Sequence, residues 1–326
     1  MLVLAGDIGG TKSLLAAARV SGSGFEIVAE QRYSSPDYPD LAPIVTEFLA
    51  GVKESVGAAC FGVPGAVIGG ECRTPNLPWF LTEHGLAERT GVPRVHLVND
   101  FAAAALGTLS LAPGATATLQ EGEPAEHGTR AVIGAGTGLG QAILFWNGAH
   151  YRVNPTEAGH GGFAAQGALQ HELALHLEKQ FLPVSVERVV SGPGLVNVYD
   201  FLVGRGVPTA AEVAASRARS DPAAAIAQHA LSGTDAACVQ ALELFVDAYG
   251  AEAGSLALRV FATGGVWVAG GIAPKILAKL KDGSFMRGFS RKGRLTDFMA
   301  RVPVKVVLEP RVGLLGAITQ AARLLA

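Results

Sequence analysis

Short apolar runs alternate with glycine-rich breaks at the start of the chain. The first run, Leu2 to Ala5, is followed by the turn Gly6 to Thr11 and by a second apolar run, Leu14 to Val20. A third β-like run, Phe25 to Tyr33, follows the turn Ser21 to Gly24. This pattern predicts a meander of three antiparallel strands.

The pattern then changes to alternating helices and strands. Apolar spacing and short buried runs predict, in chain order, a helix at 41–52, a strand at 58–63, a helix at 81–90, a strand at 95–98 and a helix at 101–109. The second of these strands delivers Asn99 and Asp100 at its carboxyl end. In α/β folds this end of a strand is where ligands are contacted.

The opening pattern returns after a connector rich in Pro, Gly and Glu at 112–128. A strand at 131–133 leads into the turn Gly134 to Gly140, and two more strands are expected at 141–146 and near 150–153. This order repeats that of the first three strands with little residue identity, so we expect two lobes that are built alike.

The second lobe is expected to be rich in helices. The predicted elements are helices at 169–181, 191–202, 210–215, 222–231 and 235–261, a strand at 265–269, a helix opened by Gly270-Gly271-Ile272, a strand at 304–308 and a last helix opened by Gly313-Leu314-Leu315-Gly316. A chain of 326 residues exceeds the usual size of one hydrophobic core. We therefore predict a small α/β domain at 1–110, completed by the C-terminal helix 314–326, and a large α/β domain at 111–313.

Composition and charge narrow the class of protein. With 49% hydrophobic and 17% charged residues the chain is globular, and its net charge of -2 gives no general attraction to nucleic acid or an anionic membrane, so we predict neither partner. The cysteines Cys60, Cys72 and Cys238 form no CxxC pair, which fits reduced thiols. Since no signal peptide or membrane-spanning run is recognised, we expect a cytoplasmic protein.

Two glycine turns suit the binding of phosphate. Glycine amides can curl around phosphate oxygens because no Cβ blocks their approach, and Asp7 within the first turn would hold magnesium through water. The alternative for the first turn is a tight hairpin with an incidental acid. The second turn, Gly134 to Gly140, has Leu139 where a dinucleotide-binding loop needs its third glycine, and no Walker loop is present. A second phosphate hairpin facing the first is the interpretation that remains.

Two further patterns have both a functional and a structural interpretation. The pair Gly270-Gly271 at a strand end suits close approach of adenosine or an α-phosphate, or is simply structural. Asp100 suits a catalytic base, or is the N-cap of the helix that follows.

Seven motifs occur in the order found in one family. They are Gly6-Asp7-Ile8-Gly9-Gly10-Thr11, Leu97-Val98-Asn99-Asp100-Phe101, Gly134 to Gly140, Glu157-Ala158-Gly159-His160, Glu187 to Gly194, Ala269-Gly270-Gly271-Ile272 and Gly313-Leu314-Leu315-Gly316. In this the chain resembles the bacterial glucokinase family, of the type that lacks the zinc-binding cysteine motif. The resemblance implies a two-lobed ribonuclease-H/actin-like ATPase fold with its active site in the cleft between the lobes. We expect no structural metal.

The resemblance also implies roles for individual residues. Asp100 matches the base that takes the proton of the sugar's 6-hydroxyl, and the other residues implied to bind sugar are Asn76, Asn99, Glu157, His160 and Glu187. The residues expected to bind the nucleotide are Gly6, Asp7, Ile8, Gly9, Gly10, Thr11, Lys12, Gly134, Gly136, Thr137, Gly138, Gly270 and Gly271. The family often has Asn where this chain has Lys12, and Gly where it has Ala158.

The expected reaction is transfer of the γ-phosphoryl group of ATP to the 6-hydroxyl of glucose, with Mg2+ as cofactor and a homodimer as the assembly. Alternatives are a kinase for another hexose, a glucokinase that uses polyphosphate, and a non-catalytic sugar-sensing regulator.

Overall fold

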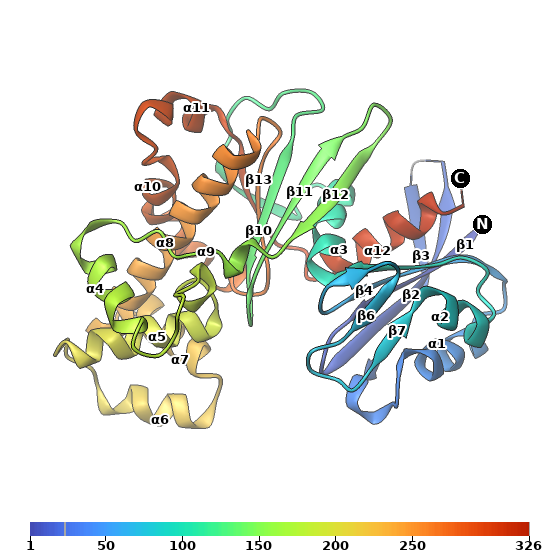
Figure 1. Ribbon diagram of the computed structural model, residues 1–326, viewed down its shortest axis with the longest axis horizontal. Coiled ribbons are helices and arrows are strands. Elements are labelled where there is room, and N and C mark those ends of the chain that lie inside the picture. Colours follow the sequence, from blue (N-terminus) through green and yellow to red (C-terminus); the bar gives the residue numbers. More distant parts are fainter. Residues whose placement is uncertain (23, 326) are drawn as a thin grey trace. The chain divides into compact units, whose positions relative to one another are not determined.

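Two large β-sheets and a small one form the framework of the computed structural model, which describes residues 1–22 and 24–325 (Figure 1). Ser23, in the predicted turn 21–24, and Ala326, at the end of the predicted last helix, lie outside the described residues. The strands are β1 Leu2–Ile8, β2 Lys12–Ser21, β3 Gly24–Ser34, β4 Val56–Val63, β5 Val67–Ile68, β6 Glu71–Arg73, β7 Phe80–Thr82, β8 Val95–Asn99, β9 Thr116–Gln120, β10 Arg130–Ala135, β11 Leu139–Trp146, β12 Tyr151–Thr156, β13 Gly265–Ala269 and β14 Val304–Val307.

The two large sheets share one strand order. The first is β3-β2-β1-β4-β8, and the second is β12-β11-β10-β13-β14 with β9 added at its edge. In the first sheet β1 and β2 form an antiparallel hairpin, and β1, β4 and β8 are parallel. In the second sheet β10 and β11 form the hairpin, and β10, β13 and β14 are parallel. The predicted meander at 2–33 is confirmed by the antiparallel pairing of β1 with β2 and of β2 with β3, and the repeat of its pattern near residue 131 is confirmed as well.

The helices follow the predicted order with additions at the end of the chain. Those of six or more residues are α1 Leu41–Ala50, α2 Glu83–Thr90, α3 Asp100–Gly107, α4 Gly167–Leu177, α5 Gly192–Gly204, α6 Ala211–Arg219, α7 Pro222–Leu231, α8 Ala236–Val260, α10 Ser284–Ser290, α11 Thr296–Arg301 and α12 Val312–Arg323. The shorter α9 spans Leu277–Lys281.

Four features correct the sequence prediction. The connector 112–128 contains β9, which pairs antiparallel with β14. The segment before α2 holds the small sheet β5-β6-β7. Residues 284–301 contain α10 and α11, which were not predicted. The predicted helix after Gly270 begins instead as a 3-10 helix, Ala273–Ile276, which runs into the five-residue α9.

The chain divides into two compact units. Unit 1 comprises residues 1–115, 152–155 and 309–326, and unit 2 comprises residues 116–151 and 156–308. The predicted domain limits at 110/111 and 313/314 stay predictions, as does the cleft between the lobes.

The first sheet of unit 1 buries both of its faces. Along β1, Leu4 packs into a cluster with Ile44 and Phe48 of α1, whereas Val3 packs into a cluster with Leu314 and Ile318 of α12. This alternation follows from the two-residue period of a strand. The C-terminal helix α12 thus covers one face of the sheet that holds the N-terminal strand, beside α3 (Figure 1).

The core of unit 2 is built on the long helix α8. Its Phe245 and Tyr249 belong to the cluster that includes Ile133 of β10 and Val268 of β13. The two glycines Gly250 and Gly288 lie where α8 and α10 cross, and a side chain at either would collide with backbone of the other helix. The crossing therefore has almost no tolerance for added volume.

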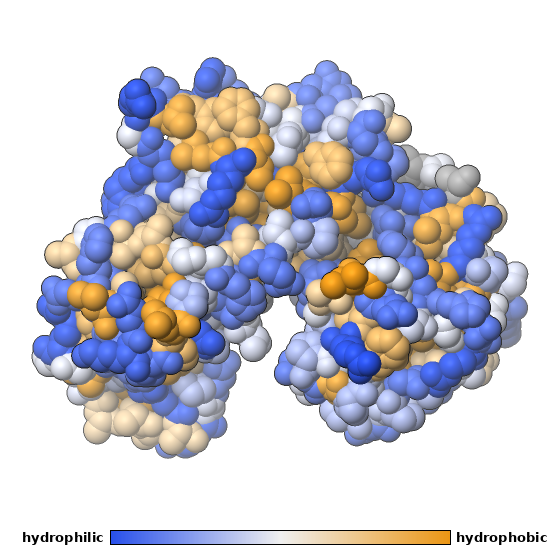
Figure 2. Space-filling view, in the orientation of Figure 1, coloured by the Kyte–Doolittle hydropathy of each residue, from blue (hydrophilic) through white to orange (hydrophobic). Residues whose placement is uncertain are grey.

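Apolar side chains also reach the surface of unit 2. Figure 2 shows a group of them over the end that carries α11, where the exposed Phe261 ring stacks on Phe298 at 4.5 Å. None of the helices among residues 1–22 and 24–325 is long and apolar enough to span a membrane.

The close packing of α12 on α3 predicts a volume-sensitive site. A Cβ at Gly316 would collide with the Ala103 carbonyl oxygen of α3, so Gly316→Ala is expected to lower the free energy of unfolding by about 1–3 kcal/mol. The matched control is Gly204→Ala at the end of α5, where a Cβ meets open space, and it should change stability by less than about 1 kcal/mol. Urea denaturation of both variants measures this difference, and equal effects would contradict the packing argument.

Candidate active site

The first glycine turn joins β1 to β2 in unit 1. The Gly9 amide donates to the Lys12 carbonyl oxygen at 2.9 Å, which closes a tight hairpin around Gly10 and Thr11. Gly6 and Ile8 are buried within β1 rather than in the turn itself, and Gly6 leaves room for the Phe61 ring. The groups of this turn that face solvent are therefore those of residues 9–12.

Two buried serines brace this turn from beneath. Ser35 donates through Oγ to the Gly9 carbonyl oxygen at 2.7 Å, and the Ser13 and Ser35 hydroxyls are 2.9 Å apart. The Ser35 amide also donates to the Thr11 carbonyl oxygen. Because these carbonyls are tied down inside the protein, the peptide planes of the turn have a fixed orientation.

Asn76 lies against the first turn. A Cβ at Gly10 would be 3.0 Å from the Cβ of Asn76. The loop that holds Asn76 is fixed by Thr74, whose hydroxyl donates to the carbonyl oxygens of Leu77 and Trp79. The exposed Asn76 amide is thus presented beside the turn by a rigid loop.

Asn99, not Asp100, is the N-cap of α3. Its Oδ1 accepts from the amides of Phe101 at 3.0 Å and Ala102 at 3.1 Å, and its Nδ2 donates to the Gly65 carbonyl oxygen and to Asp100 Oδ1, each at 3.1 Å. The structure therefore rejects the alternative in which Asp100 is present only to cap the helix. Asn99 holds Asp100, and its own polar atoms are already engaged.

Asp100 is the first residue of α3, with its carboxylate at the positive end of the helix. Oδ1 accepts from the Phe101 amide at 2.7 Å. Helix N-termini favour the ionised form of a carboxylic acid. This is the form that a base requires.

Asp7 and Asp100 are electrostatic neighbours in unit 1. Burial, together with the charge of Asp100, raises the pKa of Asp7 to about 6. Gly313 allows this crowding, since a Cβ there would lie 3.1 Å from Asp7 Oδ2. A divalent cation would relieve the repulsion, and Mg2+ commonly binds one or two carboxylates together with water and substrate phosphates.

A buried carboxylate beside a glycine turn fits magnesium held through water and phosphate oxygens. Among residues 1–22 and 24–325, no group of three or more His, Cys, Asp or Glu side chains could enclose a metal ion. A metal at Asp7 would thus complete its shell with water and phosphate oxygens.

The second glycine turn joins β10 to β11 in unit 2. The Gly136 amide donates to the Gly138 carbonyl oxygen at 2.8 Å, and the Gly136 carbonyl oxygen accepts from the Gly192 amide of α5 at 2.8 Å. A Cβ at Gly138 would lie 2.5 Å from Glu187 Oε2, so a side chain there would displace the Glu187 carboxylate. Gly134 lies within the sheet, between β11 and β13.

Glu187 links this turn to the residues implied to bind sugar. Its Oε2 accepts from the Leu139 amide at 2.8 Å, and its carbonyl oxygen accepts from Ser191, the N-cap of α5. On the other side, Gly159 packs so closely on the Leu139 carbonyl oxygen that any side chain there would collide with it. The backbone of Leu139 therefore contacts both groups, since its amide binds Glu187 and its carbonyl oxygen packs against the 158–160 turn.

Glu157 and His160 flank that turn and are largely exposed. Their side chains are 3.8 Å apart, and 68% and 64% of their areas are accessible. The short ladder formed by the Phe163 amide with the Val184 carbonyl, and by the Val186 amide with the Gly161 carbonyl, sets their register against Glu187. The structure thus brings Glu157, His160 and Glu187 to one region of unit 2.

Gly270 and Gly271 follow β13 beside the second turn. Gly270 has φ +82° and lies against Ala135, so a side chain is excluded by both conformation and space. The Ile272 amide donates to the Ala135 carbonyl oxygen at 3.3 Å. Since the helix that follows begins as a single 3-10 turn, the helix-end contribution expected here is small, and backbone approach is the better reason for the glycines.

A cavity of about 600 Å3 in unit 2 opens on both glycine segments. Its lining includes Gly136, Thr137 and Gly271 of these segments. The other side chains are mostly apolar, among them Leu195, Val196, Pro222, Ala223, Ala227, Ile272 and Ile276. Three polar side chains, Asn197, Asp221 and Lys275, also line it. An apolar cavity with a few polar groups is typical of a site for a small molecule.

A second cavity of unit 2, about 530 Å3, is lined by none of the predicted site residues. The arginines Arg287 and Arg291 on its wall are paired with Glu243 and Asp247, so it offers no free positive charge to phosphate.

Comparison with known proteins decides the family. The family model for glucokinase matches residues 4–324. The chain is 43% identical to glucokinases of Nostoc sp. and Synechocystis sp., over 99% and 98% of each chain. It belongs to the glucokinase family.

Solved structures agree with this assignment. A glucokinase from an Antarctic psychrotroph superposes with a TM-score of 0.87 at 29% identity, over 99% of both chains. A ROK family glucokinase from Streptomyces griseus, solved with glucose and AMPPNP, superposes at 0.67 and 23% identity over 99% of this chain and all of that one, a likeness of fold. The predicted family and the ribonuclease-H/actin-like fold are confirmed.

Sequence reasoning missed the groups that support this family's motifs. The braces Ser13 and Ser35, and the cavity residues Asn197, Asp221 and Lys275, carry no glycine or charge pattern of their own. Asp221 gave one signal, since Asp followed by Pro at a helix start is an N-cap, and it caps α7.

The raised pKa of Asp7 predicts a pH-dependent cost in stability. Between the unfolded value near 3.8 and the folded value of about 6, the folded protein holds the proton more tightly, so stability falls as pH rises through this window. Asp7→Asn removes the titration. We expect the variant to gain over wild type by about 1 kcal/mol more at pH 8 than at pH 5, in urea denaturation with EDTA. A stability difference that is the same at both pH values would contradict the assignment.

Proposed function

We propose that this chain is an ATP-dependent glucokinase, which transfers the γ-phosphoryl group of ATP to the 6-hydroxyl of glucose and releases ADP. The observation that carries the proposal is the placement of Asp100. Its carboxylate is held by Asn99 at the first turn of α3 and lies within electrostatic range of Asp7.

Asp100 acts on the acceptor. An ionised carboxylate accepts a hydrogen bond from the sugar hydroxyl, orients its oxygen and takes the proton as the bond to phosphorus forms. Asn99 acts mainly by fixing Asp100, because its amide is engaged with the helix cap and Gly65. This differs from the direct sugar contact that family resemblance implies for Asn99.

The remaining sugar contacts are assigned to groups in each unit. In unit 1 these are Asn76 and Asp100, and in unit 2 they are Glu157, His160 and Glu187. Each sugar hydroxyl is both donor and acceptor, and carboxylates and an imidazole can pair with several. An epimer would leave one of these groups unpaired, which disfavours it.

The nucleotide is assigned to the two glycine turns and the 600 Å3 cavity. Backbone amides of residues 10–11 and 137–138, with Gly270 and Gly271, are the proposed phosphate contacts, because the amides of Gly9 and Gly136 already donate within their own turns. The apolar walls suit adenosine. Lys12 and Thr11 add side-chain donors to the first turn. These donors would stabilise the negative charge on the phosphoryl group during transfer by electrostatic interaction.

Asp7 is the residue assigned to hold magnesium, through water. The ion would neutralise charge on the phosphate oxygens during transfer. The homodimer and the cytoplasmic location stay predictions.

A coupled ADP-release assay across a hexose panel tests the function. We expect turnover with glucose in the presence of ATP and Mg2+, and a fall in kcat of about 10²- to 10⁴-fold for Asp100→Asn, because the variant lacks the base. The matched control is Asp37→Asn, an exposed aspartate of unit 1, which should keep wild-type kcat. In a parallel assay polyphosphate replaces ATP, and the hexose phosphate formed is measured, because this donor releases no ADP.

Each alternative has its own outcome in this assay. Faster turnover with mannose, fructose or glucosamine than with glucose would reassign the substrate, and turnover with polyphosphate in place of ATP would reassign the donor. Binding of glucose without any turnover would favour a sensor. Full activity of Asp100→Asn would refute the role of the base.

A further inference from the structure

A buried hydroxyl lies where two strands of unit 2 separate. The parallel pairing of β10 with β13 ends at Gly134 and Ala269, and the chain beyond each strand forms the glycine segments 136–138 and 270–271. Tyr249 of α8 places its hydroxyl at this fork. It accepts from the Ala135 amide at 3.0 Å, and the carbonyl oxygens of Ile133 and Ala269 lie 3.4 and 3.5 Å away.

Ala135 is tied to both sides of the fork. Its amide donates to Tyr249, and its carbonyl oxygen accepts from the Ile272 amide at 3.3 Å. Gly270 packs directly on it, with room for no side chain. The position of Ala135 therefore sets the distance between the two glycine segments.

The ring of Tyr249 is enclosed by other aromatic side chains. It is fully buried and packs edge-on against Phe245, at 6.0 Å between centroids, and Phe285, at 5.5 Å. Such edge-to-face pairs favour one orientation of each ring. This packing places the Tyr249 hydroxyl at the Ala135 amide.

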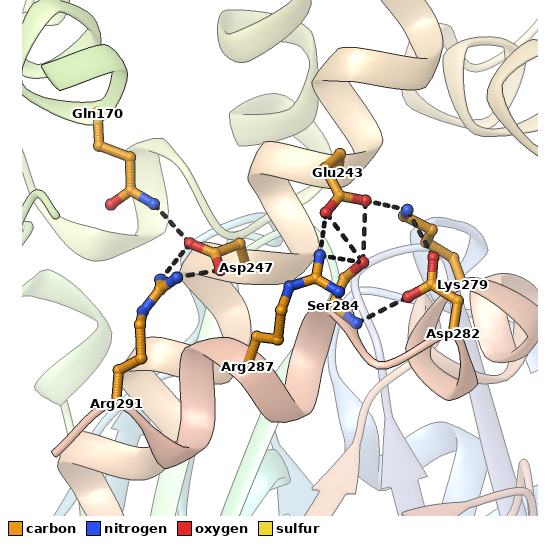
Figure 3. A network of polar contacts seen from close by, with 8 residues as sticks. All are labelled: Gln170, Glu243, Asp247, Lys279, Asp282, Ser284, Arg287 and Arg291. Carbon is orange, nitrogen blue, oxygen red and sulfur yellow. Dashed lines mark hydrogen bonds and ion pairs between the residues drawn. The ribbon is translucent and has the colours of Figure 1, made fainter. Parts of the chain in front are cut away.

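The helix that carries Tyr249 is itself locked to α10. Glu243 and Asp247 precede Tyr249 on α8 by about one and a half turns and half a turn. Glu243 pairs with Arg287 of α10, and Asp247 pairs with Arg291, the residue that follows α10 (Figure 3). Gln170 of α4 donates to Asp247 as well, at 2.9 Å. These polar contacts hold α8 along its polar edge, in addition to the apolar contacts of its core face. Tyr249 therefore projects from a helix that is fixed on both sides.

We propose that Tyr249 is a positioning residue for the phosphates of the nucleotide. Its hydroxyl replaces the missing strand pairing at the fork, and so holds residues 136–138 and 270–271 at the spacing that phosphate binding needs. The inference rests on the proposed function and adds to it a residue remote from the substrates. Burial raises the pKa of Tyr249 above its usual range, so the hydroxyl keeps its proton and donates as well as accepts.

The test compares two ligands that differ only in phosphate. Adenosine can occupy the apolar cavity alone, whereas ADP needs the glycine segments too. In Tyr249→Phe we expect the Kd for ADP to rise about tenfold, as for the loss of one well-placed hydrogen bond, and the Kd for adenosine to change less than about twofold. Isothermal titration of the full chain measures both, and KM for ATP should rise without a matching rise in KM for glucose.

Tyr199→Phe is the matched control. Tyr199 is also buried in unit 2, and its hydroxyl pairs with Thr209 at 2.6 Å, remote in sequence from both glycine segments. Both variants lose one buried hydroxyl, so both should melt at a lower temperature. Only Tyr249→Phe should change the ratio of the two affinities.

The outcomes separate this inference from the proposed function. An unchanged ADP affinity in Tyr249→Phe, or an equal loss for ADP and adenosine, overturns the positioning role. A wild-type protein that neither binds ADP nor phosphorylates glucose overturns the proposed function, and the inference with it. If Tyr249→Phe does not fold, 3-fluorotyrosine at position 249 keeps the ring and weakens the hydroxyl as an acceptor. A smaller loss selective for ADP is then the supporting result, and no selective loss the overturning one.

Discussion

The structure depends on how two glycine turns are held from below. A turn that binds phosphate must leave its amides free, so its carbonyl groups and its flanks must be fixed by something else. In unit 1 the buried hydroxyls of Ser13 and Ser35 do this, and in unit 2 the Gly192 amide and the Glu187 carboxylate do it. The sheets beneath share one strand order, but the chain fixes each turn with different chemistry.

Two acidic side chains, Asp7 and Asp100, are electrostatic neighbours in unit 1. Burial, together with the charge of Asp100, raises the pKa of Asp7 to about 6, so an ionised Asp7 is costly to stability at this place. A protein selected for stability alone would replace one of them. Gly313 leaves the space that the Asp7 carboxylate occupies, since a Cβ there would lie 3.1 Å from Asp7 Oδ2.

Much of the fold followed from local pattern, because strands with a period of two and glycine turns between them are local signals. The hairpins at 2–33 and the helix 222–231 are examples. What pattern could not give depends on pairing across the chain. Strand β9 pairs with β14, nearly two hundred residues away, and its sequence Thr116–Gln120 is too polar to stand out from a connector.

In the candidate site, too, local pattern predicted some features, and others depend on contacts between residues distant in sequence. Glycine and acidic motifs marked Asp7, Asp100 and Glu187 from the sequence, but not which neighbour each one engages. The structure gave the cap of α3 to Asn99, where the sequence left Asp100 as an equal choice. It also showed Glu187 bound to the second turn, a contact between residues 48 apart in sequence that no local pattern encodes.

The most direct test of the account is the identity of the product. The chain is incubated with ATP, Mg2+ and glucose, and the product is examined by phosphorus–proton correlation NMR. We expect a single phosphate coupled to the protons on carbon 6 of glucose, with ADP formed in equal amount. A phosphate on any other carbon, or release of inorganic phosphate with no sugar phosphate, would contradict it.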